Sequence, residues 1–159
     1  MITAEQVWQT LEEVKDPEIP VISVVEMGII QGVEVGREGV AVTMTPTFAG
    51  CPAIELMCQS IREQLSSLGV GPVSVNVSLD PPWTSDRISP AGREKLKTIG
   101  LAPPMRHGGI IELDLLEVVR CPYCDSADTN MENPFGPTLC RALYYCNTCQ
   151  QPFEKFKAL

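Results

Sequence analysis

The chain carries Cys121-Pro-Tyr-Cys124 and, 21 residues further on, Cys146-Asn-Thr-Cys149. Two thiolates three positions apart on a tight turn can bind one metal ion, and a second such pair completes a tetrahedral four-sulfur site. A closed site of this kind leaves no coordination position for a substrate. The spacing therefore predicts a zinc ribbon over residues 118–159, in which Zn²⁺ has a structural role.

Other interpretations of the cysteines carry less weight. Two disulfides would suit a secreted chain, but seven cysteines is an odd number and no secretion signal opens the sequence, so we expect a cytoplasmic protein. Iron in place of zinc would make the ribbon a rubredoxin-like electron carrier, and the ligand type alone does not separate the two metals. Cys140 could be an alternative ligand, a buried thiol or a reactive spare, and we favour the buried thiol.

Length and composition predict a folded protein of small domains. The 159 residues are 44% hydrophobic and 20% charged, as expected for a well-packed globular chain. We expect an α/β domain over residues 1–80, a Pro-rich connector over 81–117 and the ribbon over 118–159. No apolar run is long enough to span a bilayer, which predicts a soluble protein with no membrane partner.

The net charge of −8 disfavours nucleic acid as a partner. Residues 118–159 contain four acidic and four basic side chains, whereas residues 1–117 contain 16 acidic and eight basic ones. An acidic surface repels phosphate backbones, although nucleic-acid binding is a common role for zinc ribbons.

The pattern of apolar residues before the connector predicts a compact sandwich. A helix is expected over 4–15, a hairpin of strands over 28–35 and 40–45, a helix from Pro52 to Leu68, and a half-buried strand over 73–79. This order predicts an α+β fold in which the helices cover one face of a small sheet. Within the connector we expect a short helix over 90–98, and a strand over 110–119 leads into the ribbon.

Cys51 is the residue at which we expect reactivity. It lies on a Gly-containing loop before the second helix, where backbone N–H groups and the helix dipole lower a thiol pKa. Thr45 and Thr47 could donate hydrogen bonds to its sulfur. The alternative is that Gly50-Cys51-Pro52 only begins a helix, and local features do not decide between the two.

Other candidates have simpler explanations. Cys58 falls on the apolar stripe of the same helix, which predicts a core cysteine. Asp16 lies in a turn, whereas Glu26 lies in an apolar stretch and needs a partner or a function. His107, the single histidine, is expected to be a solvated loop residue, so a Cys-His catalytic pair is disfavoured.

Four segments of the first domain, together with the ribbon, resemble a known family. The first three look like the MIP18-type domain of iron–sulfur assembly factors, and the fourth with the ribbon makes the whole chain similar to the PaaD family of phenylacetate degradation. The segments are Asp16-Pro-Glu-Ile-Pro20, Val25-Glu-Met-Gly-Ile29, Met44-Thr-Pro-Thr-Phe-Ala-Gly-Cys51-Pro52 and Asp80-Pro-Pro-Trp83.

The resemblance implies an accessory protein and not an enzyme. Such proteins help to mature or maintain the iron centres of the multicomponent phenylacetyl-CoA epoxidase, which comprise a di-iron oxygenase and a reductase with a [2Fe–2S] cluster. By position, Cys51 would be the functional thiol, binding iron or a cluster transiently, with Asp16 and Glu26 as nearby candidates. The family commonly has Asp-Leu where this chain has Glu26-Met27. Cys140 falls within a family pattern, Phe-Gly-x-Thr-x-Cys, and is therefore kept as a supporting candidate.

The resemblance also names partners and an alternative role. The expected partners are the oxygenase and reductase subunits and the iron–sulfur assembly machinery, and a homodimer is among the expectations because assembly proteins of this type often dimerise. In the alternative, the chain is a structural zinc-ribbon subunit that docks onto the epoxidase.

Overall fold

The computed structural model describes residues 2–108 and 118–159, and it divides into two compact units. We call residues 1–83 with 87–89 the sandwich unit, and residues 84–86 with 90–159 the ribbon unit. The strand expected over 110–119 falls almost wholly on residues 109–117, which lie outside the described part.

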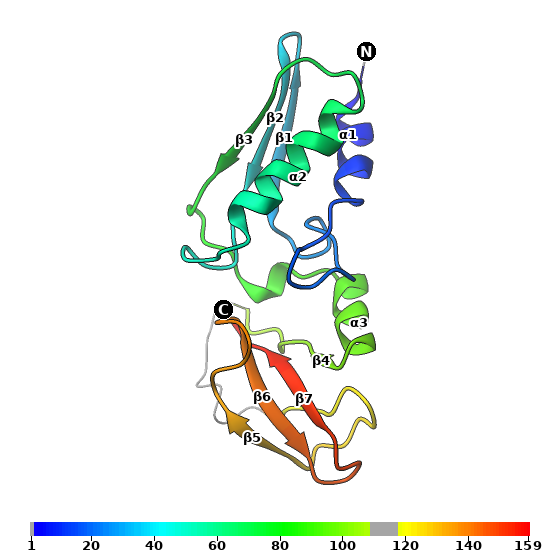
Figure 1. Cartoon of the computed structure of the whole chain (residues 1–159), viewed down its shortest axis with the longest axis vertical. Helices are drawn as coiled ribbons and strands as arrows, with labels where there is room; N and C mark the ends of the chain where they lie inside the picture. Colours follow the sequence, from blue (N-terminus) through cyan, green and yellow to red (C-terminus); the bar gives the residue numbers. More distant parts are fainter. Residues whose placement is uncertain (1, 109–117) are drawn as a thin grey trace. The chain divides into compact units, whose positions relative to one another are not determined.

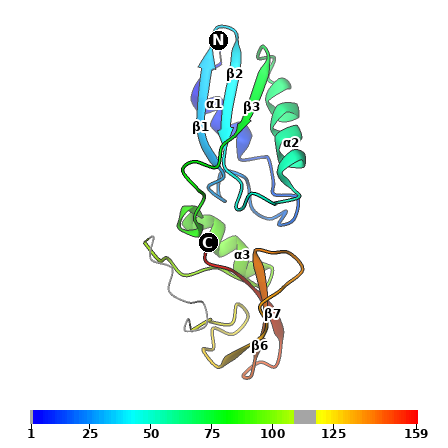
Figure 2. The same ribbon diagram turned by 90° about the vertical axis from the view of Figure 1, so that its left-hand side faces the viewer.

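The sandwich unit has a three-stranded sheet covered on one face by two helices (Figures 1 and 2). The hairpin expected from the sequence is confirmed, because β1 and β2 pair antiparallel. The crossover helix α2 then returns the chain to β3, which pairs parallel to β2, so the sheet order is β1-β2-β3. The elements are α1 (Ala4–Leu11), β1 (Ile30–Gly36), β2 (Gly39–Met44), α2 (Ile54–Ser66) and β3 (Val73–Val77).

The first helix is shorter than expected. A capping box joins Thr3 and Gln6 at its start, as the sequence predicts, but the helix ends at Leu11 and not at residue 15. The following residues pair with a neighbouring segment, since the N–H of Val24 donates to the carbonyl of Val14 at 2.9 Å. Glu13 N–H still donates to Thr10 O at 3.1 Å and Val14 N–H to Leu11 O at 3.1 Å, so a tighter turn closes the helix, and the Val14 carbonyl then pairs with Val24 instead of accepting a further helical bond.

The start of α2 and the end of β3 also differ from the boundaries expected from the sequence. α2 begins at Ile54, because Cys51 N–H donates to the Phe48 carbonyl and the preceding residues form turns, so Pro52 is not its first residue. β3 ends at Val77, which is 46% exposed, and Leu79 beyond it is 55% exposed. The alternation expected up to residue 79 is therefore wrong at its end, because β3 is an edge strand whose last residues are not covered.

The ribbon unit contains the expected short helix and a four-stranded sheet of order β4-β7-β6-β5. Along β6, every second side chain is buried, and these pack with Val119 and Phe153 around the cysteines. The fold expected from the sequence, an α+β sandwich followed by a four-cysteine ribbon, is confirmed. The elements are α3 (Pro90–Thr98), β4 (Leu101–Ala102), β5 (Thr129–Asn133), β6 (Arg141–Cys146) and β7 (Pro152–Phe156). A 3₁₀ turn at Ser85–Arg87 has its first two residues in this unit and Arg87 in the sandwich unit.

A search of the helices in the described ranges finds none that is both long and apolar enough to cross a membrane.

Candidate functional site

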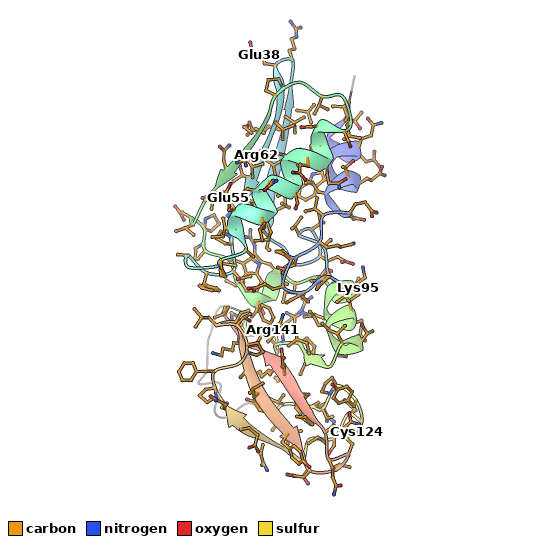
Figure 3. All side chains as sticks on the ribbon, viewed as in Figure 1. Glu38, Glu55, Arg62, Lys95, Cys124 and Arg141 are labelled. Atoms are coloured by element: carbon orange, nitrogen blue, oxygen red, sulfur yellow. The ribbon has the colours of Figure 1, made fainter. Side chains whose placement is uncertain are left out.

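The four ribbon cysteines converge on one point. Their Sγ atoms all lie within 4.8 Å of one another, and the Cys121–Cys149 and Cys124–Cys146 pairs are each 3.6 Å apart. A tetrahedral zinc with Zn–S bonds of about 2.3 Å requires sulfurs about 3.8 Å apart. The four thiols therefore fit a Zn²⁺ ion, which would be fully coordinated and would hold the two turns together. Cys124 lies on the loop before β5 (Figure 3).

The two turns that carry these cysteines repeat the same backbone pattern. In the first, Asp125 N–H donates to the Cys121 carbonyl at 2.9 Å, and in the second Gln150 N–H donates to the Cys146 carbonyl at 2.9 Å. Both donors have left-handed backbone, with φ of 60° and 58°. The chain thus builds two matching knuckles, each of which presents its two sulfurs to the same side.

Hydrogen bonding and burial alter the acidity of these thiols in opposite directions. The backbone N–H of Cys149 is the main cause that lowers the pKa of Cys146 to about 7, whereas burial raises the pKa of Cys149 to about 12. Thiols this close cannot all ionise without a cation among them, because each thiolate disfavours the next. A bound Zn²⁺ would supply that positive charge and would displace the thiol protons.

In the sandwich unit, three backbone hydrogen bonds connect the segments around residues 14, 24–29 and 45 one after the other. Val24 N–H donates to Val14 O at 2.9 Å, Ile29 N–H to Val24 O at 3.0 Å, and Thr45 N–H to Ile29 O at 2.8 Å. The residues around 16, 26 and 45 therefore meet at one end of the sheet. Trp83 joins them, since its Nε1–H donates to Met27 O at 3.0 Å.

Cys51 lies in the loop that leaves β2 at this end. We call residues 45–53 the Cys51 loop. Its first residue, Thr45, is buried, whereas Thr47 and Cys51 are half-buried. Ile54 N–H, at the start of α2, donates to the Cys51 carbonyl at 3.4 Å. Cys51 thus stands two residues before the N-cap Ala53, further from the helix dipole than the sequence suggests.

The carboxylates of Asp16 and Glu26 each accept backbone hydrogen bonds in a turn. Asp16 Oδ1 accepts from the N–H of Glu18 at 2.8 Å and of Ile19 at 3.0 Å. Glu26 Oε2 accepts from Ser23 N–H at 3.0 Å, and Ser23 Oγ accepts from Glu26 N–H at the same distance. Both side chains therefore stabilise turns in the stretch of chain that precedes β1.

The two remaining cysteines are buried in different units. Cys58 is 3% exposed on α2, its Sγ lies 3.5 Å from Met44 Sδ, and burial raises the pKa of its thiol. Cys140 is 5% exposed, and its Sγ lies 3.1 Å from Thr138 Oγ1 in the ribbon unit. Neither belongs to the four-cysteine cluster.

His107 is not the freely solvated residue expected from the sequence. Its side chain is 9% exposed, and Nε2 lies 3.3 Å from the carbonyl of Leu159 and 3.9 Å from Asp86 Oδ1. Asp86 in turn accepts the N–H groups of His107 at 3.0 Å and Gly108 at 2.7 Å. Sequence reasoning missed Asp86, because its partners lie 21 and 22 residues further along the chain.

Sequence reasoning also missed Gln31. Its side-chain amide donates to Thr45 Oγ1 and, at 3.2 Å, to the carbonyl of Pro81. No local pattern identifies this residue, since its partners lie 14 and 50 positions away.

These features define a class of protein: an α/β domain with a thiol loop at one end of its sheet, joined to a closed four-cysteine ribbon. Residues 4–82 match the family described as iron–sulfur cluster assembly protein, and residues 112–157 match the PaaD zinc beta ribbon domain. The chain is 40% identical, over 97% of its length and 92% of the relative's, to a protein of Escherichia coli (strain K12) that is named as one subunit of a "Putative 1,2-phenylacetyl-CoA epoxidase".

The chain therefore belongs to the PaaD family. The chain is also 39% identical over 89 residues to an Fe-S protein maturation auxiliary factor of Porphyromonas gingivalis, a match that covers 55% of this chain and 84% of that relative. The crystal structure of a DUF59 domain from Bacillus anthracis superposes with a TM-score of 0.55 at 29% identity, over 58% of this chain and 89% of that one.

Proposed function

We propose that this protein is a non-catalytic accessory factor that helps to mature or maintain the iron centres of a phenylacetyl-CoA epoxidase. The main support for this proposal is the match over nearly the whole chain to a protein named as a subunit of that epoxidase, combined with a first domain related to Fe-S maturation factors. A maturation factor related to an epoxidase subunit has that epoxidase as its natural client.

Cys51 is the proposed working thiol. It is half-buried on a loop whose first residue, Thr45, donates its N–H to Ile29 O in another family segment, whereas Cys58 and Cys140 are buried. The ribbon thiols are all committed when a zinc ion is bound, so Cys51 is the sulfur left for a transient bond to iron or to a labile cluster. In this proposal Asp16 and Glu26 shape the turns beside the loop, Thr45 and Thr47 supply hydroxyl groups within it, and Cys140 supports the ribbon.

The ribbon is proposed to hold zinc and to serve recognition of a partner. Of the charged residues in 118–159, four are acidic and four basic, so this segment lacks the negative excess of the rest of the chain. The oxygenase and reductase subunits are the proposed partners, and the assembly machinery and a second copy of this chain are further ones.

Replacement of Cys51 tests this function in cells that depend on the epoxidase. Cys51→Ser should leave the fold and the bound zinc intact but abolish epoxidase activity, whereas Cys58→Ala, on the adjacent helix, should retain it. Full activity with Cys51→Ser would overturn the proposal. Co-purification with the epoxidase at fixed stoichiometry, together with full activity of this variant, would favour the structural-subunit alternative.

Metal analysis tests the electron-carrier alternative. A colourless purified protein with one zinc and no iron per chain is the expected result. Iron at one per chain, with the absorption bands of an iron–tetrathiolate centre, would instead support a rubredoxin-like role.

A further inference from the structure

A β-bulge places Gln31 out of register in β1. Ile30 pairs with Met44 and Gly32 pairs with Thr43, so Gln31 is an extra residue with no partner of its own on β2. A bulge of this kind bends the strand and redirects the side chain of the inserted residue, and bulges are frequent beside functional sites. This bulge lies at the end of the hairpin from which the Cys51 loop departs.

The redirected side chain joins two segments on either side of that loop. Gln31 Nε2 donates to the hydroxyl of Thr45, the first residue of the Cys51 loop, and lies 3.2 Å from the carbonyl of Pro81. Ser78 N–H donates to Met44 O at 2.9 Å, so the chain that leads to Pro81 is already held beside β2. One amide group thus ties the start of the Cys51 loop to the segment that follows β3.

The burial of Thr45 increases the importance of this contact. Thr45 is 1% exposed, so its hydroxyl cannot exchange its protein partners for bulk water. A buried hydroxyl whose acceptor function is satisfied by Gln31 has its own hydrogen left to donate, and its rotation is limited. The orientation of the Thr45 hydroxyl therefore depends on the amide of Gln31.

We propose that Gln31 is a positioning residue for Cys51: its amide fixes the Thr45 hydroxyl and the Pro81 turn, and thereby sets the conformation and reactivity of the Cys51 loop. The inference rests on the proposed role of Cys51 as the working thiol. It can nevertheless be tested on the purified protein without any client.

The test is alkylation of the full-length, zinc-loaded protein with iodoacetamide between pH 6 and 9, with each cysteine followed by peptide mass spectrometry. Gln31→Met keeps the length of the side chain and removes both donors, and Gln31→Glu keeps the shape with acceptors alone. Each variant should change the Cys51 rate at pH 7 about threefold or more and displace the pH midpoint of the profile, as expected for loss of a buried hydrogen bond. Gln59→Met is the matched control, because Gln59 is exposed on α2, where its amide donates to Glu63 at 2.8 Å.

The alkylation rate of Cys58 separates positioning from a general loss of stability, because loosening of the whole unit would also expose this buried thiol. Rates and midpoints within about twofold of wild type in both Gln31 variants would overturn the inference. An equal acceleration of Cys58 and Cys51 would overturn it as well. Should Gln31→Met fail to fold, Gln31→Glu and Gln31→Asn decide. The shortened amide of Gln31→Asn cannot span both acceptors. This outcome does not depend on the client, so the two proposals can fail separately. If the Gln31 variants alter the Cys51 profile while cells with Cys51→Ser keep full epoxidase activity, the positioning role of Gln31 stands and the proposed function falls.

Discussion

Gly28, in the segment Val25–Ile29, allows the most discriminating stability experiment. It has φ of +70°, and a Cβ added there would lie 2.5 Å from the carbonyl oxygen and 2.6 Å from the Cβ of Arg87. Gly69, after α2, has nearly the same φ of +68°, but an added Cβ would meet nothing within 4 Å. Alanine at these two positions therefore carries the same backbone strain, with and without a steric clash.

The expected magnitudes follow from this difference. Left-handed backbone costs a residue with a Cβ about 1–2 kcal/mol, and the reduced freedom of the unfolded chain offsets about 0.4–1 kcal/mol of it. Gly69→Ala should therefore lower the free energy of unfolding by roughly 0–1.6 kcal/mol. Gly28→Ala should cost about 1–3 kcal/mol more, because the clash involves backbone that must shift.

Urea unfolding followed by tryptophan fluorescence measures the stability of the sandwich unit, in which both substitutions lie. The two tryptophans, Trp8 and Trp83, both lie in the sandwich unit, and Trp83 is only 4% exposed and donates to Met27 next to Gly28. Equal costs for Gly28→Ala and Gly69→Ala, within about 0.5 kcal/mol, would refute the reasoning that Gly28 is required by close approach of Arg87.

Three further predictions concern the thiols and Asp86. In the zinc-loaded protein Cys51 should be alkylated at least about tenfold faster than Cys58, because burial raises the pKa of Cys58 and hides its sulfur; equal rates would contradict this. Cys121→Ser removes one of the four zinc ligands, so this variant should lose its zinc to a chelator that leaves the wild type loaded. Cys140→Ser should keep one zinc per chain, and retention of zinc by both variants would argue against the assigned ligands. Burial raises the pKa of Asp86, but hydrogen bonds from the His107 and Gly108 N–H groups lower it further, so its net value lies below the usual 3.8. The contribution of Asp86 to the free energy of unfolding is therefore present above pH 3.8 and is lost as the pH falls through its lower pKa in the folded protein. Calorimetry should find that the stability of Asp86→Asn falls less steeply with decreasing pH in this acidic range, and an unchanged pH dependence would be the contrary result.

The sequence predicts those parts of the fold in which local chemistry decides the structure. The CxxC spacing alone indicates the ribbon, and the structure brings all four sulfurs within 4.8 Å. The hairpin, α3 and the core position of Cys58 also follow from periodicity and turn residues. In each case the signal lies within about twenty residues of chain, the range over which periodicity and turn chemistry act.

Features that depend on distant segments could not be predicted in this way. α1 ends early because Val14 pairs with Val24, and the end of β3 is exposed because no strand of the described sheet covers that edge. The bulge at Gln31 depends on register, and its partners are set by how β2 and the segment after β3 meet. His107 lies against Leu159, 52 residues away, which no local pattern contains.

The iron content of the epoxidase itself tests the central claim most directly. The oxygenase and reductase would be purified from cells that carry wild-type protein, Cys51→Ser or Cys58→Ala, and their iron measured per chain. The account predicts iron-depleted epoxidase from the Cys51→Ser cells and fully loaded epoxidase from the other two. Fully loaded epoxidase from the Cys51→Ser cells would contradict it.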